Sequence, residues 1–244
     1  MLGNFTLHKG SKCVFVNNTS NGKNIAEVVT RALQRVIDTA IENKTFLGIF
    51  EKHSEKYRIL GTRYNSHVFV ERFAISIFGI AALGVGFTAY ERDKSGSISI
   101  WVQRRGAEVL YPNMLDLIAA GGVPANHTPF KYMLDEAFEE ASFSEELVRK
   151  YARSTGVVIY SKRYKRRPYF PVTYCYDMPL PKGEIPRLFR SKVAKFIRIS
   201  IKNVIDVIRC KEFRPGSDLL LINFFIRYGI ITAKNETNYT ELNV

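Results

Sequence analysis

The sequence predicts a mixed β-sheet that lies between helices, a fold of the α/β or α+β type. Apolar residues make up 46% of the 244 residues and aromatic residues 13%, so the chain can bury a sizeable core and is not disordered. Patterns typical of strands and of helices follow one another without a regular strand–helix alternation. This order of elements points to that fold class.

The first helix is expected at residues 25–42. Apolar residues recur there at spacings of three and four, and Asn24, a residue type that caps helix N-termini, comes directly before. Ser217 is expected to cap the last long helix and Gly229 to end it. The further helices are expected at residues 129–141, 144–153, 202–209 and 218–228.

Strand signals lie between these helices. The pair Ser95-Gly96 indicates a hairpin turn, and the alternating residues 97–102 after it indicate a strand. An apolar strand that ends in a glycine pair is expected near residues 115–122, and short strands with turns are expected over 46–72. Two further strands are expected at residues 156–160 and 172–176.

One apolar stretch allows two interpretations. Phe73 to Tyr90 is an uncharged run of 18 residues, which reaches the lower limit for a membrane span. Gly79, Gly84 and Gly86 interrupt it, so two buried strands broken at the glycines fit as well. Because the run is so short, we favour the strands and expect no membrane span.

Charge and cysteine content limit the partners and the compartment. The 36 basic and 23 acidic residues give a net charge of +13, which favours phosphorylated, nucleic-acid or acidic-lipid partners. Cys13, Cys175 and Cys210 are too far apart in sequence for a zinc motif or a disulfide scaffold. Residues 1–13 show no signal-peptide pattern, so we expect an intracellular protein, cytoplasmic first and mitochondrial as the alternative.

A cluster of acidic residues lies in the helix that starts at Thr128-Pro129. Glu136, Glu139 and Glu140 are spaced so that Glu136 shares a helix face with both others, and Asp135 adds a fourth charge. Like charges at this spacing destabilise a helix, and clustered carboxylates are the ligands that Mg²⁺ prefers. The alternative is a solvated acidic face that lysines or arginines balance elsewhere in the fold.

The segment from Gly121 to Phe143 resembles the signature of the Nudix hydrolase superfamily, Gly-x5-Glu-x7-Arg-Glu-U-x-Glu-Glu-x-Gly-U, in which U is apolar. Without a gap, the matching positions are Gly121, Glu136, Ala137, Glu139, Glu140 and Phe143. At three positions the chain departs from the pattern: His127 replaces Glu, Asp135 replaces Arg and Ser142 replaces Gly.

The resemblance is closer to one branch, the Nudix proteins related to the N-terminal half of fungal thiamine pyrophosphokinases. It covers roughly residues 65–240, and the segments that carry it include 67–72, 100–105, 111–116, 174–181, 212–215, 225–232 and 235–239. It implies a Nudix α/β/α sandwich with a mixed sheet over residues 66–244, preceded by a small N-terminal helix-containing region over residues 1–65.

The resemblance also implies an activity, metal-dependent hydrolysis of a diphosphate bond in a nucleoside-diphosphate-like or thiamine-diphosphate-like molecule. Glu136, Glu139 and Glu140 are then catalytic and hold Mg²⁺ or Mn²⁺, with the Gly121 carbonyl nearby. Arg104 and Arg105 are the candidates for binding the diphosphate. The branch usually carries an acid where this chain has Lys192.

A second function is compatible with the charge, a catalytically weak Nudix fold that binds RNA or a nucleotide within a larger assembly. The segment 162–167 is basic and is followed by Tyr169 and Phe170, a pattern found where proteins hold phosphates and stack bases. A solvated hairpin tip is the alternative. His8, His53, His67 and His127 show no metal-ligand spacing, and P-loop and dinucleotide fingerprints are absent.

Overall fold

The computed structural model describes residues 4–11, 13–46, 51–61, 67–164, 167–189 and 192–242. The chain divides into two compact units. Unit 1 comprises residues 1–83, 124–126 and 160–171, and unit 2 comprises residues 84–123, 127–159 and 172–244. Our boundary between residues 65 and 66 stays a prediction.

Unit 1 is built on helix α1 (Ile25–Glu42), which has the predicted bounds. Its buried face includes Leu33 and Ile37, and it packs against β4 (Phe69–Glu71), which pairs with β3 (Lys56–Arg58). Asn24 is the N-cap, as expected, but its side chain makes no capping hydrogen bond. A separate hairpin pairs β1 (Phe5–His8) with β2 (Cys13–Val16).

The apolar run from Phe73 is not two strands, so that expectation was wrong for its first half. The chain forms a 3-10 turn over Arg72–Ala74 and the short helix α2 (Ile75–Phe78) before strand β5 (Ala81–Arg92). Gly79, at φ 65°, ends the helix in the left-handed conformation that glycine adopts without strain. Among the described residues, no helix is long and apolar enough to cross a membrane.

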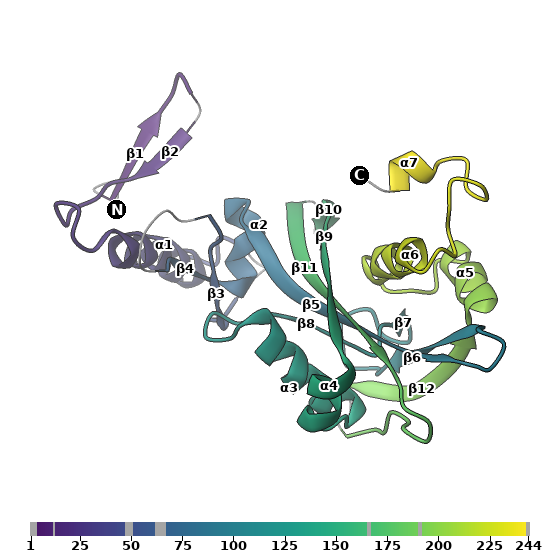
Figure 1. Ribbon diagram of the computed structural model, residues 1–244. Helices are drawn as coiled ribbons and strands as arrows, with labels where there is room; N and C mark the ends of the chain where they lie inside the picture. The colour runs from purple at the N-terminus through teal and green to yellow at the C-terminus, as the bar shows by residue number, and fades with distance from the viewer. Residues whose placement is uncertain are drawn as a thin grey trace. The chain divides into compact units, whose positions relative to one another are not determined.

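The sheet of unit 2 has the order β11-β5-β6-β12 (Figure 1). Strand β11 spans Arg167–Pro179, β6 spans Ile98–Arg105 and β12 spans Val193–Ser200. Strand β9 (Arg153–Ile159) pairs with β11. The strand expected near residues 115–122 is divided into β7 (Leu115–Asp116), which pairs with β6, and β8 (Ala119–Gly122), which pairs with β5.

Helices cover both faces of this sheet. A side chain at Gly121 of β8 would meet Glu136 of α3 (Pro129–Ala141), whereas one at Gly86 of β5 would meet Leu220 of α6 (Ser217–Arg227). Gly86 lies beside Ala120, one residue from Gly121, and neighbouring strand residues point to opposite faces. The predicted α/β fold, a sheet with helices on it, is confirmed (Figure 1).

Some elements differ from the expected ones at their ends, and strand β12 and the β1–β2 hairpin were not expected. Helix α4 (Glu145–Tyr151) stops two residues before the expected end, because β9 begins at Arg153. Gly216 is the N-cap of α6, and Ser217, the expected cap, is its first helical residue. The other elements are β10 (Lys162–Tyr164), α5 (Ile201–Arg209) and α7 (Tyr239–Leu242). Cys13, Cys175 and Cys210 are free thiols.

Candidate metal centre

Helix α3 presents its acidic residues to β8. The Thr128 hydroxyl caps the helix by accepting a hydrogen bond from the Lys131 amide at 3.3 Å. Glu136 and Glu140 are each 6% exposed, because the same turns bury the apolar stripe of the helix against the sheet. The Glu139 side chain is 32% exposed. Two glutamates of the predicted site are therefore buried, and the third is partly exposed.

Glu136 has an oxygen atom that no described residue contacts with a hydrogen bond. Its Oε2 is buried and makes no hydrogen bond within the described part of the chain, while Tyr132 hydrogen-bonds the same side chain. Its Oε1 lies so close to Gly121 that a Cβ at that position would clash with it. Burial raises the pKa of Glu136. A buried carboxylate oxygen without a donor is costly, and a bound cation would remove that cost.

Among the described residues, both hydrogen bonds to Glu140 go to the same oxygen atom. Its Oε2 accepts from Gln103 Nε2 at 2.8 Å and from the Ala120 amide at 3.3 Å. Burial, followed by the neighbouring charges of Glu136 and Asp116, raises the pKa of Glu140 to about 8. Two adjacent buried carboxylates with raised pKa values are a suitable donor set for a hard divalent cation.

Lys192 lies beside these carboxylates. Its Nζ is 3.8 Å from Glu139 Oε2, and its charge lowers the pKa of Glu136 against the larger effect of burial. The Lys192 carbonyl accepts a hydrogen bond from the Gly106 amide at 2.8 Å, which fixes the backbone before β12. Lys192, at the position where the branch usually carries an acid, thus lies next to the acidic cluster.

Two other departures from the Nudix pattern contact each other. His127 Nε2 lies 3.3 Å from Asp135 Oδ2, and Lys131 Nζ lies 2.7 Å from Asp135 Oδ1. The Nudix pattern has glutamate where this chain has His127, and arginine where this chain has Asp135. The acidic and the basic residue have therefore exchanged places. In this chain the two residues form an ion pair when the His127 imidazole is protonated.

Arg104 and Arg105 are both engaged in contacts. Arg105 Nη1 lies 2.6 Å from Asp116 Oδ2, and Asp116 is fully buried. Arg104 Nη1 donates to the Asn113 carbonyl at 2.6 Å. As neighbours in β6, the two side chains point to opposite faces of the sheet. Their binding of a diphosphate stays a prediction, as do the roles of the three glutamates and of Gly121.

Sequence reasoning gave no role to three residues that support this cluster, Tyr132, Gln103 and Asp116. Tyr132 lies one helical turn before Glu136, a spacing that brings two side chains together. Gln103 of β6 is 1% exposed, and a buried polar side chain requires a partner. The spacing of Tyr132 was visible in the sequence, whereas the burial of Gln103 is visible only in the fold. Asp116 contacts Ser217, 101 residues away, and no local pattern announces that pairing.

The basic segment at 162–167 is only partly described, because residues 165 and 166 lie outside the described ranges. Lys162 lies 5.5 Å from the Tyr169 ring centroid, and Arg167 lies 5.0 Å from that of Phe46. These cations therefore stack on rings of unit 1 itself. RNA binding stays a prediction.

The chain matches no family model. Among solved structures, an Ap4A hydrolase of C. elegans overlaps 62% of this chain and 99% of its own, with 13% identity and a TM-score of 0.46. The NUDIX domain of Shewanella oneidensis NrtR, solved with ADP ribose, overlaps 61% of this chain and 88% of its own, with 12% identity and a TM-score of 0.44.

Sequence relatives match over more of the chain. Nudix hydrolase 20 of Arabidopsis thaliana is 31% identical over 222 residues, which cover 87% of this chain and 56% of that protein. Nudix hydrolase 24 of the same plant is 30% identical over 211 residues, covering 84% and 56%. An uncharacterised protein of Saccharomyces cerevisiae is 32% identical over 208 residues, covering 80% and 60%.

These relatives support the predicted resemblance to the Nudix hydrolase superfamily. The chain spans little more than half the length of the curated relatives that it matches. The finer assignment, to the branch related to thiamine pyrophosphokinases, stays a prediction.

Proposed function

We propose that this chain is a Nudix-type hydrolase that cleaves a diphosphate bond in a small molecule. Water attacks one phosphorus atom, the bridging oxygen leaves with the other phosphate, and two phosphate products result. The observation that carries this proposal is the buried Glu136 Oε2, which has no hydrogen-bond partner among the described residues and lies in a cluster with Glu139 and Glu140. The relatives named Nudix hydrolases support it.

The residues present fit a divalent cation. Glu136, Glu139 and Glu140 supply carboxylate oxygens, which Mg²⁺ and Mn²⁺ prefer, and the Gly121 backbone lies against Glu136. When bound, such an ion polarises phosphoryl oxygens and lowers the pKa of a water molecule.

Around that site, the chain holds its own groups in place. Tyr132 orients Glu136, and Gln103 and the Ala120 amide orient Glu140. Lys192 places a positive charge beside Glu139, where it competes with a divalent cation for that carboxylate. We propose that Arg104 or Arg105 contacts the diphosphate after exchanging one of its present partners.

The substrate class we propose is a nucleoside-diphosphate-like or thiamine-diphosphate-like compound. The net charge of +13 suits any such anion and does not choose between them. An intracellular location, in the cytoplasm or in mitochondria, stays a prediction; the two Arabidopsis relatives are described as chloroplastic.

The test is hydrolysis of a panel of diphosphates by the full chain. Nucleoside diphosphates, nucleoside diphosphate sugars and thiamine diphosphate are incubated with Mg²⁺, with Mn²⁺ or with EDTA, and released phosphate and monophosphates are quantified. We expect turnover of at least one compound that EDTA abolishes.

The matched control is a protein purified in the same way with Glu145→Gln and Glu146→Gln on α4, two exposed acids outside the cluster. It should keep full activity. No metal-dependent product from any compound would overturn the proposal.

A further inference from the structure

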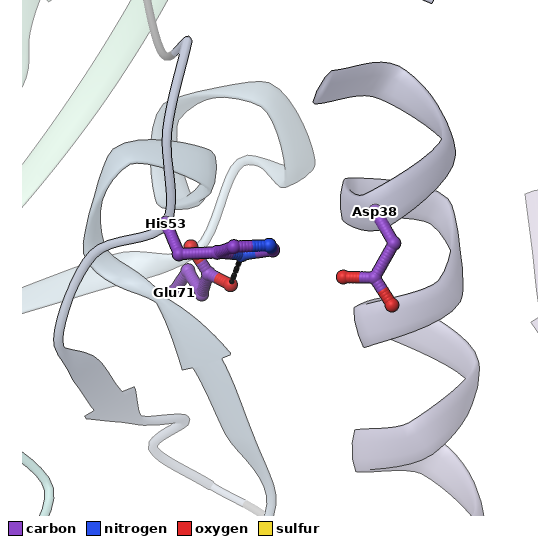
Figure 2. Close-up of side chains that lie close together, drawn as sticks. All are labelled: Asp38, His53 and Glu71. Atoms are coloured by element: carbon purple, nitrogen blue, oxygen red, sulfur yellow. Dashed lines mark hydrogen bonds and ion pairs between the residues drawn. The ribbon is translucent and has the colours of Figure 1, made fainter. Parts of the chain in front are cut away.

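A second group of potential metal ligands lies in unit 1, apart from the glutamates of α3. Asp38 extends from α1, His53 from the segment before β3, and Glu71 from β4. One potential ligand atom of each lies within 4.8 Å of those of the other two. Figure 2 shows the His53 ring between the two carboxylates, with its Nδ1 2.7 Å from Glu71 Oε1.

One amide holds both carboxylates. Gln34 Nε2 donates to Asp38 Oδ1 at 2.8 Å and to Glu71 Oε1 at 2.6 Å. The Ser54 amide donates to Glu71 Oε2 at 2.8 Å, and Glu71 is 4% exposed. In metal sites, donors behind the ligands fix the orientation of the carboxylates and strengthen binding.

The two carboxylates have no strong cation of their own. Within the described ranges, neither forms an ion pair with a lysine or an arginine, although the chain carries a net charge of +13. Asp38 also lines a cavity of about 430 Å³, together with Asn4, Phe5, Arg35, Val36, Thr39 and Glu42. The His53 side chain is 61% exposed. A small ion can therefore reach the trio.

We propose that Asp38, His53 and Glu71 bind a transition-metal ion, Zn²⁺ by preference. One imidazole nitrogen with two carboxylate oxygens is a donor set that suits Zn²⁺ and related ions, whereas Mg²⁺ avoids imidazole. Ligand atoms on tetrahedral Zn²⁺ lie roughly 3.3 Å apart, so the trio closes slightly around the ion. His53 Nδ1 then exchanges Glu71 for the metal, while Gln34 and Ser54 keep their hydrogen bonds. Water completes the coordination.

Zinc bound here would join α1 to β4 and to the segment before β3. The ion thereby links parts of unit 1 that are far apart in sequence, and it raises the thermal stability of the chain by mass action. This role is independent of the proposed hydrolysis at α3.

The test is titration of the metal-free full chain with Zn²⁺ in excess Mg²⁺, followed by calorimetry and by the thermal midpoint. We expect one Zn²⁺ per chain and a higher midpoint. His53→Gln and Asp38→Asn should each abolish both effects, and Gln34→Leu should weaken binding by roughly 10- to 100-fold. Co²⁺ should give the absorption spectrum of a tetrahedral site with nitrogen and oxygen ligands.

The control is His8→Gln. His8 and Cys13 are register partners in the β1–β2 hairpin, and imidazole and thiolate are both ligand types that zinc accepts. His8→Gln should leave binding unchanged, and Glu139→Gln with Glu140→Gln should do the same. Loss of Zn²⁺ binding in His8→Gln, an unchanged affinity in His53→Gln with a normal melting curve, or no binding up to about 1 mM Zn²⁺ in the wild type would each overturn the proposal.

Discussion

The chain has two groups of carboxylates that differ in how many hydrogen-bond donors reach their oxygen atoms. On α3, the buried Oε2 of Glu136 has no donor among the described residues, and their two hydrogen bonds to Glu140 go to one oxygen. In unit 1, Glu71 receives donors at both of its oxygens, from Gln34 and His53 at one and from Ser54 at the other.

This difference separates two reasons for binding a metal. A buried carboxylate that already has its donors is stable without an ion, so a metal at Glu71 must displace an existing contact to enter. A buried carboxylate that lacks donors is destabilising until a cation arrives. We therefore expect the α3 cluster to depend on its ion and the trio of unit 1 only to gain from one.

The strongest test of this difference is the loss of hydrolysis on removing a carboxylate from α3. Glu139→Gln and Glu140→Gln should each lower kcat/KM at least about a hundredfold, because metal-assisted charge stabilisation is worth several kcal/mol. His53→Gln should leave the rate unchanged. Rates are measured at saturating Mg²⁺. Near-normal turnover by either variant would show that the substituted glutamate is not a metal ligand.

Lys192 offers a second test, since it places a fixed cation beside Glu139. Lys192→Glu adds a carboxylate and removes a competing charge, so the affinity for Mn²⁺ should rise by about tenfold, and hydrolysis should rise with it. Lys195→Glu, an exposed change in the neighbouring strand, is the control. Tighter Mn²⁺ binding with slower hydrolysis would show that Lys192 contacts the substrate instead.

Thermal stability distinguishes the clusters less strongly. Mg²⁺ should raise the midpoint of the wild type, and Glu136→Gln should blunt that rise, because the amide removes one charge that the ion neutralises. The Zn²⁺-induced rise, which depends on His53, should persist in Glu136→Gln. An equal Mg²⁺ response in wild type and variant would mean that Mg²⁺ binds elsewhere.

The smallest expected effect is on the pH dependence of the metal-free protein. The pKa of Glu140 is raised to about 8, against about 4.3 in an unfolded chain. Between these pH values, Glu140 keeps a proton in the folded state that it has lost in the unfolded chain. The free energy of unfolding therefore falls as the pH rises through that window. In Glu140→Gln, the thermal midpoint should fall less between pH 5 and pH 8. The difference should be about 2–4 °C for each kcal/mol of pH-dependent free energy of unfolding that the substitution removes. Parallel curves in EDTA would contradict the raised pKa.

Local patterns predicted much of the fold. Helices α1 and α3 have their predicted bounds, because apolar spacing and, for α3, a capping hydroxyl with proline define a helix within one stretch of chain. The first half of the apolar run from Phe73 was wrongly predicted as a strand, because its β-branched and aromatic residues favour strands. In the structure it contains the short helix α2, which ends at the left-handed Gly79.

The contacts of the two candidate sites could be predicted only in part. The spacing of the α3 glutamates follows from the sequence, but the missing donor at Glu136 and the approach of Lys192 depend on tertiary packing. His127 and Asp135 were visible as separate departures from a pattern, and only the fold shows that they pair. Asp38, His53 and Glu71 are 15 and 18 residues apart in sequence, which no ligand motif describes.

Strands β5 and β11 each begin in unit 1 and end in unit 2. Unit 1 includes residues 160–171. Its packing can therefore be completed only after the ribosome has made about two thirds of the chain. Until then, the core of unit 1 lacks Tyr169, which packs against it. The first segment of unit 1 is thus made well before the segment that completes its packing.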